Sequence, residues 1–223
     1  QEFTRLCQEA GIDRRECFLT NTIAARPLDN KFDQHFCCKK DQVGENYSLP
    51  PLSQGKYLRP EYIPELDRLK SELSEVQPNL IVALGAKALW ALSGSSAIGS
   101  MRGTTLEAKL LPGAKMLATY HPSYLFKVWS HRPVVLADLL KAKHESGFAE
   151  IRRPDREVLV FPTLEEIEQW FLDYANNAQI LSIDIETSKG QITDIGFSPR
   201  RNRSMVITFV NRDGSNHWAS PQH

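Results

Sequence analysis

Leu80-Ile-Val-Ala-Leu84 leads directly into Gly85, and Lys115-Met-Leu-Ala-Thr-Tyr120 leads into His121-Pro122-Ser123. Each is a short apolar run typical of a buried parallel strand, and each ends in a glycine or a polar turn. Helical spacing of apolar residues is expected before, between and after these runs, over about 60–77, 86–92 and 130–144. Helices that alternate with short apolar strands predict an α/β fold, an α/β/α sandwich around a parallel sheet.

The rest of this half contains one more periodic segment and one long connection. Residues 2–10 are expected to form an amphipathic helix that ends at Gly11, and Glu16–Ala24 a short buried strand ending in a polar turn. Residues 29–60 are rich in Lys, Asp, Gln, Gly and Pro, so they are expected to form a long loop or insertion.

Polar motifs follow three of the predicted strands, where open α/β sheets bind ligands. They are Thr20-Asn21, Leu84-Gly85-Ala86-Lys87 and Thr119-Tyr-His-Pro-Ser-Tyr-Leu125. Taken singly, each has an ordinary structural explanation: a turn or helix cap at Asn21, a strand end at Gly85 and a turn at His121. Arg102-Gly103, in a Gly/Ser-rich loop, would alone be a surface feature.

The order of these motifs resembles the uracil-DNA glycosylase superfamily over roughly residues 1–145, and most of all its family-four and bacteriophage-type branch. The resemblance rests on T-N-x-x-x-x-R-P, P-N-L-I-V-A-L-G-x-x-A, R-G and T-Y-H-P-S-Y-L. It implies that Asn21 reads the edge of uracil, since an amide both donates and accepts. It also implies that a neutral His121 stabilises the departing uracil anion by donating a hydrogen bond.

The resemblance also implies a set of DNA contacts. Ser123 would hold a flanking phosphate, and Tyr124 or Leu125 would wedge into the gap left by the flipped base. The remaining DNA-binding candidates are Gly85, Lys87 and Arg102.

Three features of the family are expected to be missing from this sequence. The motif that positions water, and the ring on which uracil stacks, would lie before Gln1. The family-four enzymes hold an iron–sulfur cluster on four cysteines, and two of those positions correspond to Ala25 and Tyr62. Thiolates are needed to hold such a cluster, so none is expected, and the adjacent Cys37 and Cys38 are poor substitutes.

After a polar linker at 147–156, a new pattern begins. Strands are expected at 158–161, 180–184, 190–197 and 205–210, the last two antiparallel, with a helix capped by a Thr163–Glu166 box. Asp184 and Glu186 stand two apart on a strand, so both carboxylates project from one face. Such a pair suits Mg²⁺ or Mn²⁺, although a solvent-facing edge strand would also carry two acids.

Leu181–Phe197 resembles the first motif of the DEDD-type 3′–5′ exonucleases, which implies the first strands of a ribonuclease-H-like domain over 157–223. The domains are therefore expected at 1–146 and 157–223. The remaining carboxylates of that family would lie downstream of His223, so this segment alone is not expected to degrade DNA. A glycosylase-like domain followed by an exonuclease resembles the front of a bacteriophage-type DNA polymerase, whose polymerase domain would follow in the same chain.

The amino-acid composition bears on the DNA contacts, the state of the cysteines and the compartment of the protein. Lys plus Arg and Asp plus Glu both number 27, so DNA contacts would depend on local basic clusters. The four cysteines form no C-x-x-C pair, which favours reduced thiols and a cytoplasmic protein, in the host cell if phage-encoded. No membrane span or signal peptide is expected, and the lack of an initiator Met suggests part of a longer chain.

Three functions remain open from the sequence. The first is recognition or excision of uracil coupled to an exonuclease and DNA polymerase. The second is a catalytically inactive DNA-binding, uracil-sensing or partner-docking module. The third is a small-molecule or nucleotide-binding α/β domain unrelated to DNA.

Overall fold

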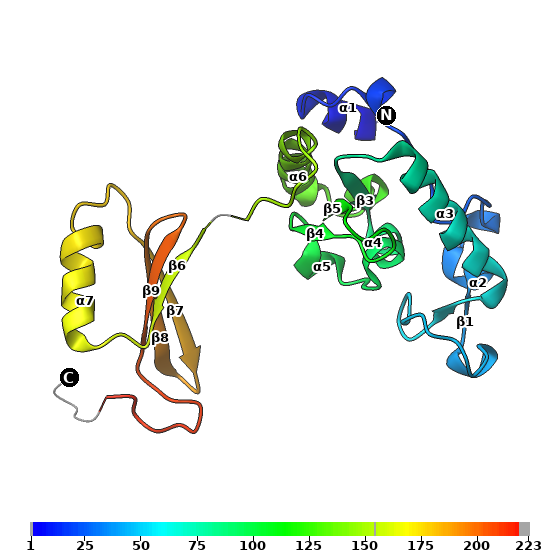
Figure 1. Cartoon of the computed structure of the whole chain (residues 1–223). Coiled ribbons are helices and arrows are strands. Elements are labelled where there is room, and N and C mark those ends of the chain that lie inside the picture. The colour runs from blue at the N-terminus through cyan, green and yellow to red at the C-terminus, as the bar shows by residue number, and fades with distance from the viewer. Residues whose placement is uncertain (1, 154, 219–223) are drawn as a thin grey trace. The chain divides into compact units, whose positions relative to one another are not determined.

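The structure is a computed structural model that describes residues 2–153 and 155–218 (Figure 1). The chain divides into two compact units, Gln1–Ile151 and Arg152–His223. The division falls within the predicted linker, 147–156. Each unit has its own sheet and its own apolar core.

The first unit is built on a three-stranded sheet in the order β3-β5-β4. β3 and β5 are parallel, as predicted, and Leu84 lies beside Thr119 at their carboxyl ends. β4 was not predicted, and it pairs with β5 in the antiparallel direction, so the sheet is mixed rather than parallel. The strands span Ile81–Leu84 (β3), Thr105–Glu107 (β4) and Lys115–Thr119 (β5).

Helices cover both faces of this sheet, because alternate residues of a strand point to opposite sides. On β3, Ile81 and Ala83 belong to a core cluster with residues of α3 and α4. Val82 packs against the other cluster, which contains residues of α1 and α6. The helices of this unit span Glu2–Glu9 (α1), Phe32–Phe36 (α2), Ile63–Val76 (α3), Ala86–Ser93 (α4), Ile98–Met101 (α5) and Arg132–Glu145 (α6).

The sequence pattern predicts both the buried face of helix α3 and the residue where the helix ends. Leu66, Leu69 and Leu73 are its buried residues, spaced along one face. The helix ends at Gln77, which adopts a left-handed conformation with φ 48°, immediately before Pro78. Within the described residues, no helix is long and apolar enough to cross a membrane.

The strand predicted at Glu16–Ala24 is wrong. The segment begins with a 3₁₀ turn, Arg14–Glu16 (η1), and continues without regular structure. Phe18 and Leu19, which a buried strand would have covered, are 52% and 55% exposed. The predicted loop 29–60 holds only short elements, among them two-residue strands at Cys37–Cys38 (β1) and Tyr57–Leu58 (β2).

The second unit is a four-stranded sheet in the order β6-β9-β8-β7, with β6 and β9 parallel and the other pairs antiparallel. Its strands span Glu157–Val160 (β6), Ser182–Ser188 (β7), Gln191–Arg200 (β8) and Arg203–Thr208 (β9). Helix α7 (Leu164–Trp170) begins at the predicted capping box of Thr163 and Glu166 and continues as a π-helical turn, Phe171–Ala175.

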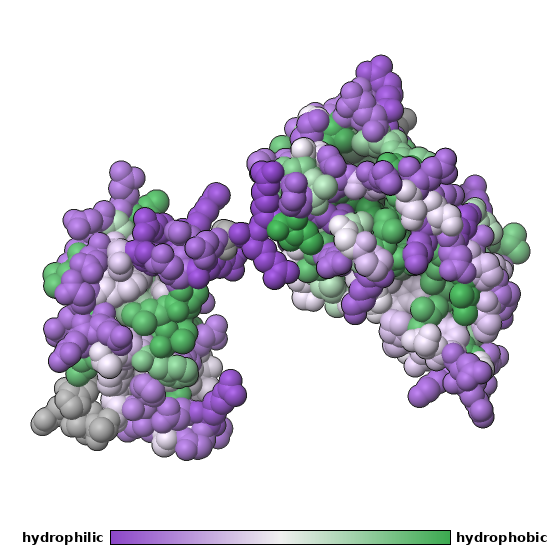
Figure 2. All heavy atoms as spheres, viewed as in Figure 1, coloured by the Kyte–Doolittle hydropathy of each residue, from purple (hydrophilic) through white to green (hydrophobic). Residues whose placement is uncertain are grey.

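Residues of α7 and of that turn pack on Phe197, Met205 and Ile207, and thereby cover one face of the sheet. Figure 2 shows a hydrophobic area on the visible side of this unit, and exposed apolar side chains on its strands include Val158 and Val160. The hairpins and the capped helix agree with the sequence pattern, but membership of a ribonuclease-H-like fold does not follow from them.

Candidate functional site

The carboxyl ends of β3 and β5 bring Gly85 and His121 together. The Gly85 N–H donates to the Thr119 carbonyl at 2.8 Å, which continues the pairing of the two strands. Gly85 has φ 87°, and a Cβ atom there would lie 2.9 Å from His121 Cβ. Only a glycine therefore allows the histidine to approach the end of β3 this closely.

His121 is held in a defined orientation by the turn that follows it. Its Nδ1 accepts the Ser123 N–H at 3.1 Å and lies 2.7 Å from Ser123 Oγ. His121 is exposed as a residue, but partial desolvation of its ring lowers the pKa of His121 from its ordinary value, which favours the neutral imidazole near pH 7. Because Nδ1 accepts a hydrogen bond, the proton of the neutral ring resides on Nε2, which is left to donate to a ligand.

The turn after His121 is the 3₁₀ helix Pro122–Phe126 (η5). The ring of Tyr124 stacks at 5.6 Å on His131, which also stacks on Tyr120 at 5.1 Å. Leu125, a candidate wedge, is 1% exposed and belongs to the apolar core. Its burial corrects the prediction, because a side chain fixed in the core cannot enter DNA.

Phe126, in the same turn, was not among the predicted site residues. It is 80% exposed, beside the exposed Lys127. Apolar periodicity gave no signal for it, because Tyr-Leu-Phe is continuous and does not show which ring faces solvent.

Asn21 lies in the irregular segment after η1 and is exposed. Its carbonyl accepts a hydrogen bond from Arg68 of α3 at 2.7 Å. The sequence gave no indication of this partner, because Arg68 lies 47 residues away on a helix with other charged residues.

Lys87 and Arg102, both predicted to bind DNA, have partners within the unit. Lys87 Nζ lies 2.5 Å from Asp33 Oδ1, and burial of Asp33 is outweighed by this contact, so the pKa of Asp33 is lowered. Arg102 donates from Nε to Oδ2 of Asp138 at 2.9 Å and from a second nitrogen to Oδ1. Asp138 is 3% exposed, so Arg102 serves a buried internal contact.

The cysteines do not fit an iron–sulfur cluster. Ala25 and Tyr62 supply no thiol, and the ring of Tyr62 packs edge-on against Phe36 at 4.7 Å. Burial raises the pKa of the Cys7, Cys37 and Cys38 thiols, which disfavours the thiolates that iron requires. Across 2–153 and 155–218, no group of three or more Cys, His, Asp or Glu side chains is arranged to hold a metal ion.

In the second unit, Asp184 and Glu186 lie on β7, at the edge of the sheet, and both are exposed. Glu186 pairs with Asp194 of β8, and Asp184 with Gly196, so the three carboxylates share one face. Ile183 and Phe197 are paired in the neighbouring register, and Phe197 packs under α7. The carboxylates therefore lie on the face opposite the helix.

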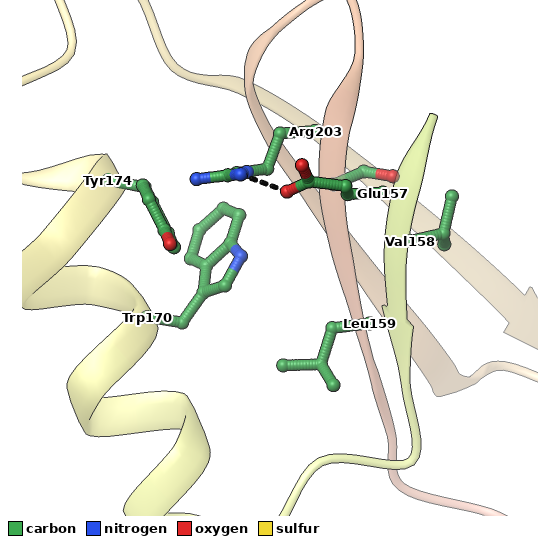
Figure 3. Close-up of a pocket in the computed structure, with 7 residues that line it drawn as sticks. Glu157, Val158, Leu159, Trp170, Tyr174 and Arg203 are labelled. Atoms are coloured by element: carbon green, nitrogen blue, oxygen red, sulfur yellow. Dashed lines mark hydrogen bonds and ion pairs between the residues drawn. The ribbon is translucent and has the colours of Figure 1, made fainter. Parts of the chain in front are cut away.

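A pocket of about 260 Å³ lies on the helix side of that sheet (Figure 3). Neither Asp184 nor Glu186 lines it. Arg203 lies 3.8 Å above the Tyr174 ring and pairs with Glu157, while the buried Trp170 ring lies between the helix and the strands. The guanidinium has partners on both sides, which is typical of a packing contact.

Two comparisons with known proteins bear on the first unit. A Type-4 uracil-DNA glycosylase from Thermotoga maritima is 29% identical over 144 residues, which cover 63% of this chain and 62% of that protein. The chain thus spans somewhat less than two thirds of this curated relative. The family model for the uracil DNA glycosylase superfamily matches residues 1–143, more than half of the chain. The chain therefore belongs to the uracil DNA glycosylase superfamily.

Proposed function

We propose that the first unit excises uracil from DNA by hydrolysing its N-glycosidic bond. The proposal depends on the state of His121. Its Nδ1 accepts a hydrogen bond from the Ser123 N–H, and its lowered pKa leaves a neutral ring with a donor at Nε2. A fixed donor that needs no reorganisation stabilises charge as it develops. Family membership supports the same chemistry, and the name of the relative links that protein to uracil in DNA.

In the proposed reaction, Asn21 binds the base and His121 stabilises the leaving group. The base is flipped out of the DNA stack, and the amide of Asn21 donates to and accepts from its edge. The bond between the sugar C1′ and the base nitrogen then breaks, and the electron pair leaves with uracil. His121 Nε2 stabilises the anion by donating to a base oxygen. Water adds to C1′ and loses one proton to solvent, and the uracil anion takes up one proton from solvent.

The proposal also includes contacts to DNA. Ser123 is the proposed phosphate contact because it is exposed in the turn after His121; its N–H and Oγ contact His121 Nδ1, so a phosphate would draw the hydroxyl away from the ring. Tyr124 and the exposed Phe126 are the two aromatic residues of η5, and one of these rings would fill the gap that the flipped base leaves in the DNA stack. Lys87 and Arg102 are left out of the DNA interface, because their charges are matched internally.

The test uses the full-length protein on single-stranded and duplex DNA with one uracil, followed by alkali to cleave abasic sites. We expect cleavage at uracil in the wild-type protein and its loss in His121→Ala. His144→Ala is the matched control, since His144 is an exposed histidine on α6. Equal cleavage by the wild-type protein and His121→Ala would refute the role of the imidazole.

The alternative is a module that binds DNA without excising a base. Because 27 basic residues are balanced by 27 acidic ones, and because Lys87 and Arg102 pair internally, such a module would contact DNA through few cations. In that case the same DNA would be bound with an affinity that falls with salt, and alkali would reveal no product.

We also propose that the second unit supplies two carboxylates to a divalent metal site of a 3′–5′ exonuclease, with a polymerase domain in the same protein. The support is the placement of Asp184 and Glu186 on one open face of the sheet. Mg²⁺ is commonly held by one or two carboxylates together with water and substrate phosphates, so the pair fits a partial site. The metal would activate water and stabilise the leaving oxygen. A plain acidic edge strand is the competing explanation.

The exonuclease proposal is tested on the full-length protein with 5′-labelled single-stranded DNA and Mg²⁺ or Mn²⁺. Shortening from the 3′ end is expected, and the double variant Asp184→Ala, Glu186→Ala should abolish it. The matched control changes Glu165 and Glu168, exposed acids of α7, to Ala. Undiminished degradation by the Asp184/Glu186 variant would support the edge-strand explanation.

A further inference from the structure

The segment that carries Asn21, residues 18–26, lies outside the helices and strands of the first unit. Between Phe18 and Arg26, no backbone N–H or carbonyl bonds to another backbone group in the described part of the chain. One side chain, Ile23, anchors the segment in the core with 5% exposure. Any further order in this segment must come from side chains.

Three charged residues of α3 provide it. Glu65, Arg68 and Glu72 follow one another at intervals of three and four, so they lie on one face of the helix. The Ala24 N–H donates to Glu65 at 2.7 Å, and Thr20 Oγ1 donates to Glu72 at 2.6 Å. Helix α3 therefore binds the segment through hydrogen bonds on both sides of Asn21.

Arg68 joins these contacts at their centre. Its Nε donates to Glu65 at 3.0 Å, and one terminal nitrogen donates to Glu72 at 2.6 Å. The other terminal nitrogen donates to the Asn21 carbonyl at 2.7 Å. A guanidinium presents its donors in a rigid planar fork, whereas an ammonium group is a compact charge on a flexible stem, so Arg68 orders its three acceptors more precisely than a lysine would.

We propose that Arg68 is a positioning residue for base recognition: it fixes the backbone at Asn21 and thereby the place of the Asn21 amide. This rests on the proposed function, in which that amide reads uracil. The amide itself is exposed, so its orientation depends on the backbone that Arg68 holds. Ile23 is buried independently of the contacts of Arg68, so in a variant without Arg68 we expect the segment to loosen rather than detach.

The experiment measures single-turnover excision of uracil by full-length protein carrying Arg68→Met, Arg68→Lys, Asn21→Ala, and Arg68→Met combined with Asn21→Ala. Arg68→Met keeps the apolar stem and removes all three donors. The matched control is Lys70→Met, an exposed cation on the same helix. Backbone ¹⁵N order parameters of residues 18–24 are recorded in parallel, since they do not depend on activity.

A misplaced recognition group can cost about 100-fold in rate, and we expect Arg68→Met to lose on the order of that factor. Arg68→Lys should recover part of it, and Lys70→Met should lose nothing. In the Asn21→Ala background, Arg68→Met should have little further effect, because residues that act through one another are not additive. The order parameters should fall from about 0.85 toward 0.6 in Arg68→Met alone.

Two results would overturn the proposal. A full additional loss in the double variant would mean that Arg68 acts independently of Asn21, and unchanged order parameters would mean that it does not hold the segment. If the wild-type protein excises no uracil, the proposed function fails, and the recognition role fails with it. The order parameters then still decide whether Arg68 holds the segment.

Discussion

The guanidinium of Arg102 lies against the buried carboxylate of Asp138 and contacts both of its oxygens. Thr119, the last residue of β5, donates to the same carboxylate at 2.7 Å. Gly103 is so close that a Cβ atom there would lie 2.7 Å from Asp138 Oδ1. The pair thus connects α6, the segment before β4 and the end of β5, two residues before His121.

Replacing Arg102 should therefore affect stability more than DNA binding. Removing one partner of a buried ion pair typically costs about 3–5 kcal/mol, because the other charge is left unmatched. We expect Arg102→Ala to lower the free energy of unfolding in urea by an amount of that order. The slope of log affinity against log salt should stay unchanged, whereas loss of a phosphate contact would reduce it by about one. A reduced slope at normal stability would restore Arg102 to the DNA interface.

Gly85→Ala should impair the site through His121. The new Cβ atom would lie 2.9 Å from His121 Cβ, so the histidine or the strand end must move. A displaced catalytic group can cost about 100-fold in rate. Gly113→Ala is the control for backbone strain, because Gly113 has φ 85° and no atom within 4 Å of a built Cβ. Similar excision rates for the two variants would show that the close approach at Gly85 does not matter.

The excision rate should depend on pH through His121. Burial lowers its pKa below the ordinary value of about 6.5, and the donor role needs the neutral ring. The rate should thus be flat above pH 7 and fall only on acidification, with a midpoint below 6.5. A pH–rate profile of the wild-type protein measures this midpoint, and a value above 6.5 would contradict the assignment.

The same shift has a defined effect on stability. The unfolded chain binds a proton at His121 more readily than the folded chain, so acidification favours unfolding. The contribution is fully present above about pH 6.5 and is lost as the pH falls through the lower, folded pKa. Urea unfolding of the wild-type protein should therefore lose stability over this window more steeply than that of His121→Gln.

The regular parts of both units could be predicted because local patterns agree with tertiary contacts there. The apolar run Leu80–Leu84 forms β3, and the leucine spacing of α3 marks its buried face. The capping box at Thr163 fixes the start of α7. The carboxyl ends of β3 and β5 then bring Gly85 and His121 together, as the parallel arrangement required.

The errors arise where distant side chains decide the structure. Phe18 and Leu19 are apolar, yet their segment is held by charged residues of α3, and no local pattern reveals that. β4 is only three residues long and pairs at the edge of the sheet. Leu125 has the apolar character of a wedge, but burial against α6 gives it a place in the core.

The side chain of Lys115 contacts the residues at the end of the first unit. Its side chain is fully buried, and Nζ donates to the carbonyls of Glu145, Phe148 and Glu150 at 2.8, 2.7 and 3.1 Å, as well as to the Glu145 carboxylate. The ammonium also lies 3.8 Å above the Phe148 ring. The residues directly after α6 are therefore attached to β5, although the sequence placed the linker from residue 147.

Lys115→Met should release this attachment. The variant keeps an apolar stem but leaves three carbonyls and one carboxylate in or near the interior without their donor. Loss of one partner of a buried pair costs about 3–5 kcal/mol, and we expect a decrease of that order in the free energy of unfolding. Limited proteolysis should cut wild-type protein only beyond Glu150 but Lys115→Met also at 146–150. Lys109→Met, which changes an exposed lysine, is the control. Cleavage of the wild-type protein within 146–150 at the same rate would show that Lys115 does not hold this segment.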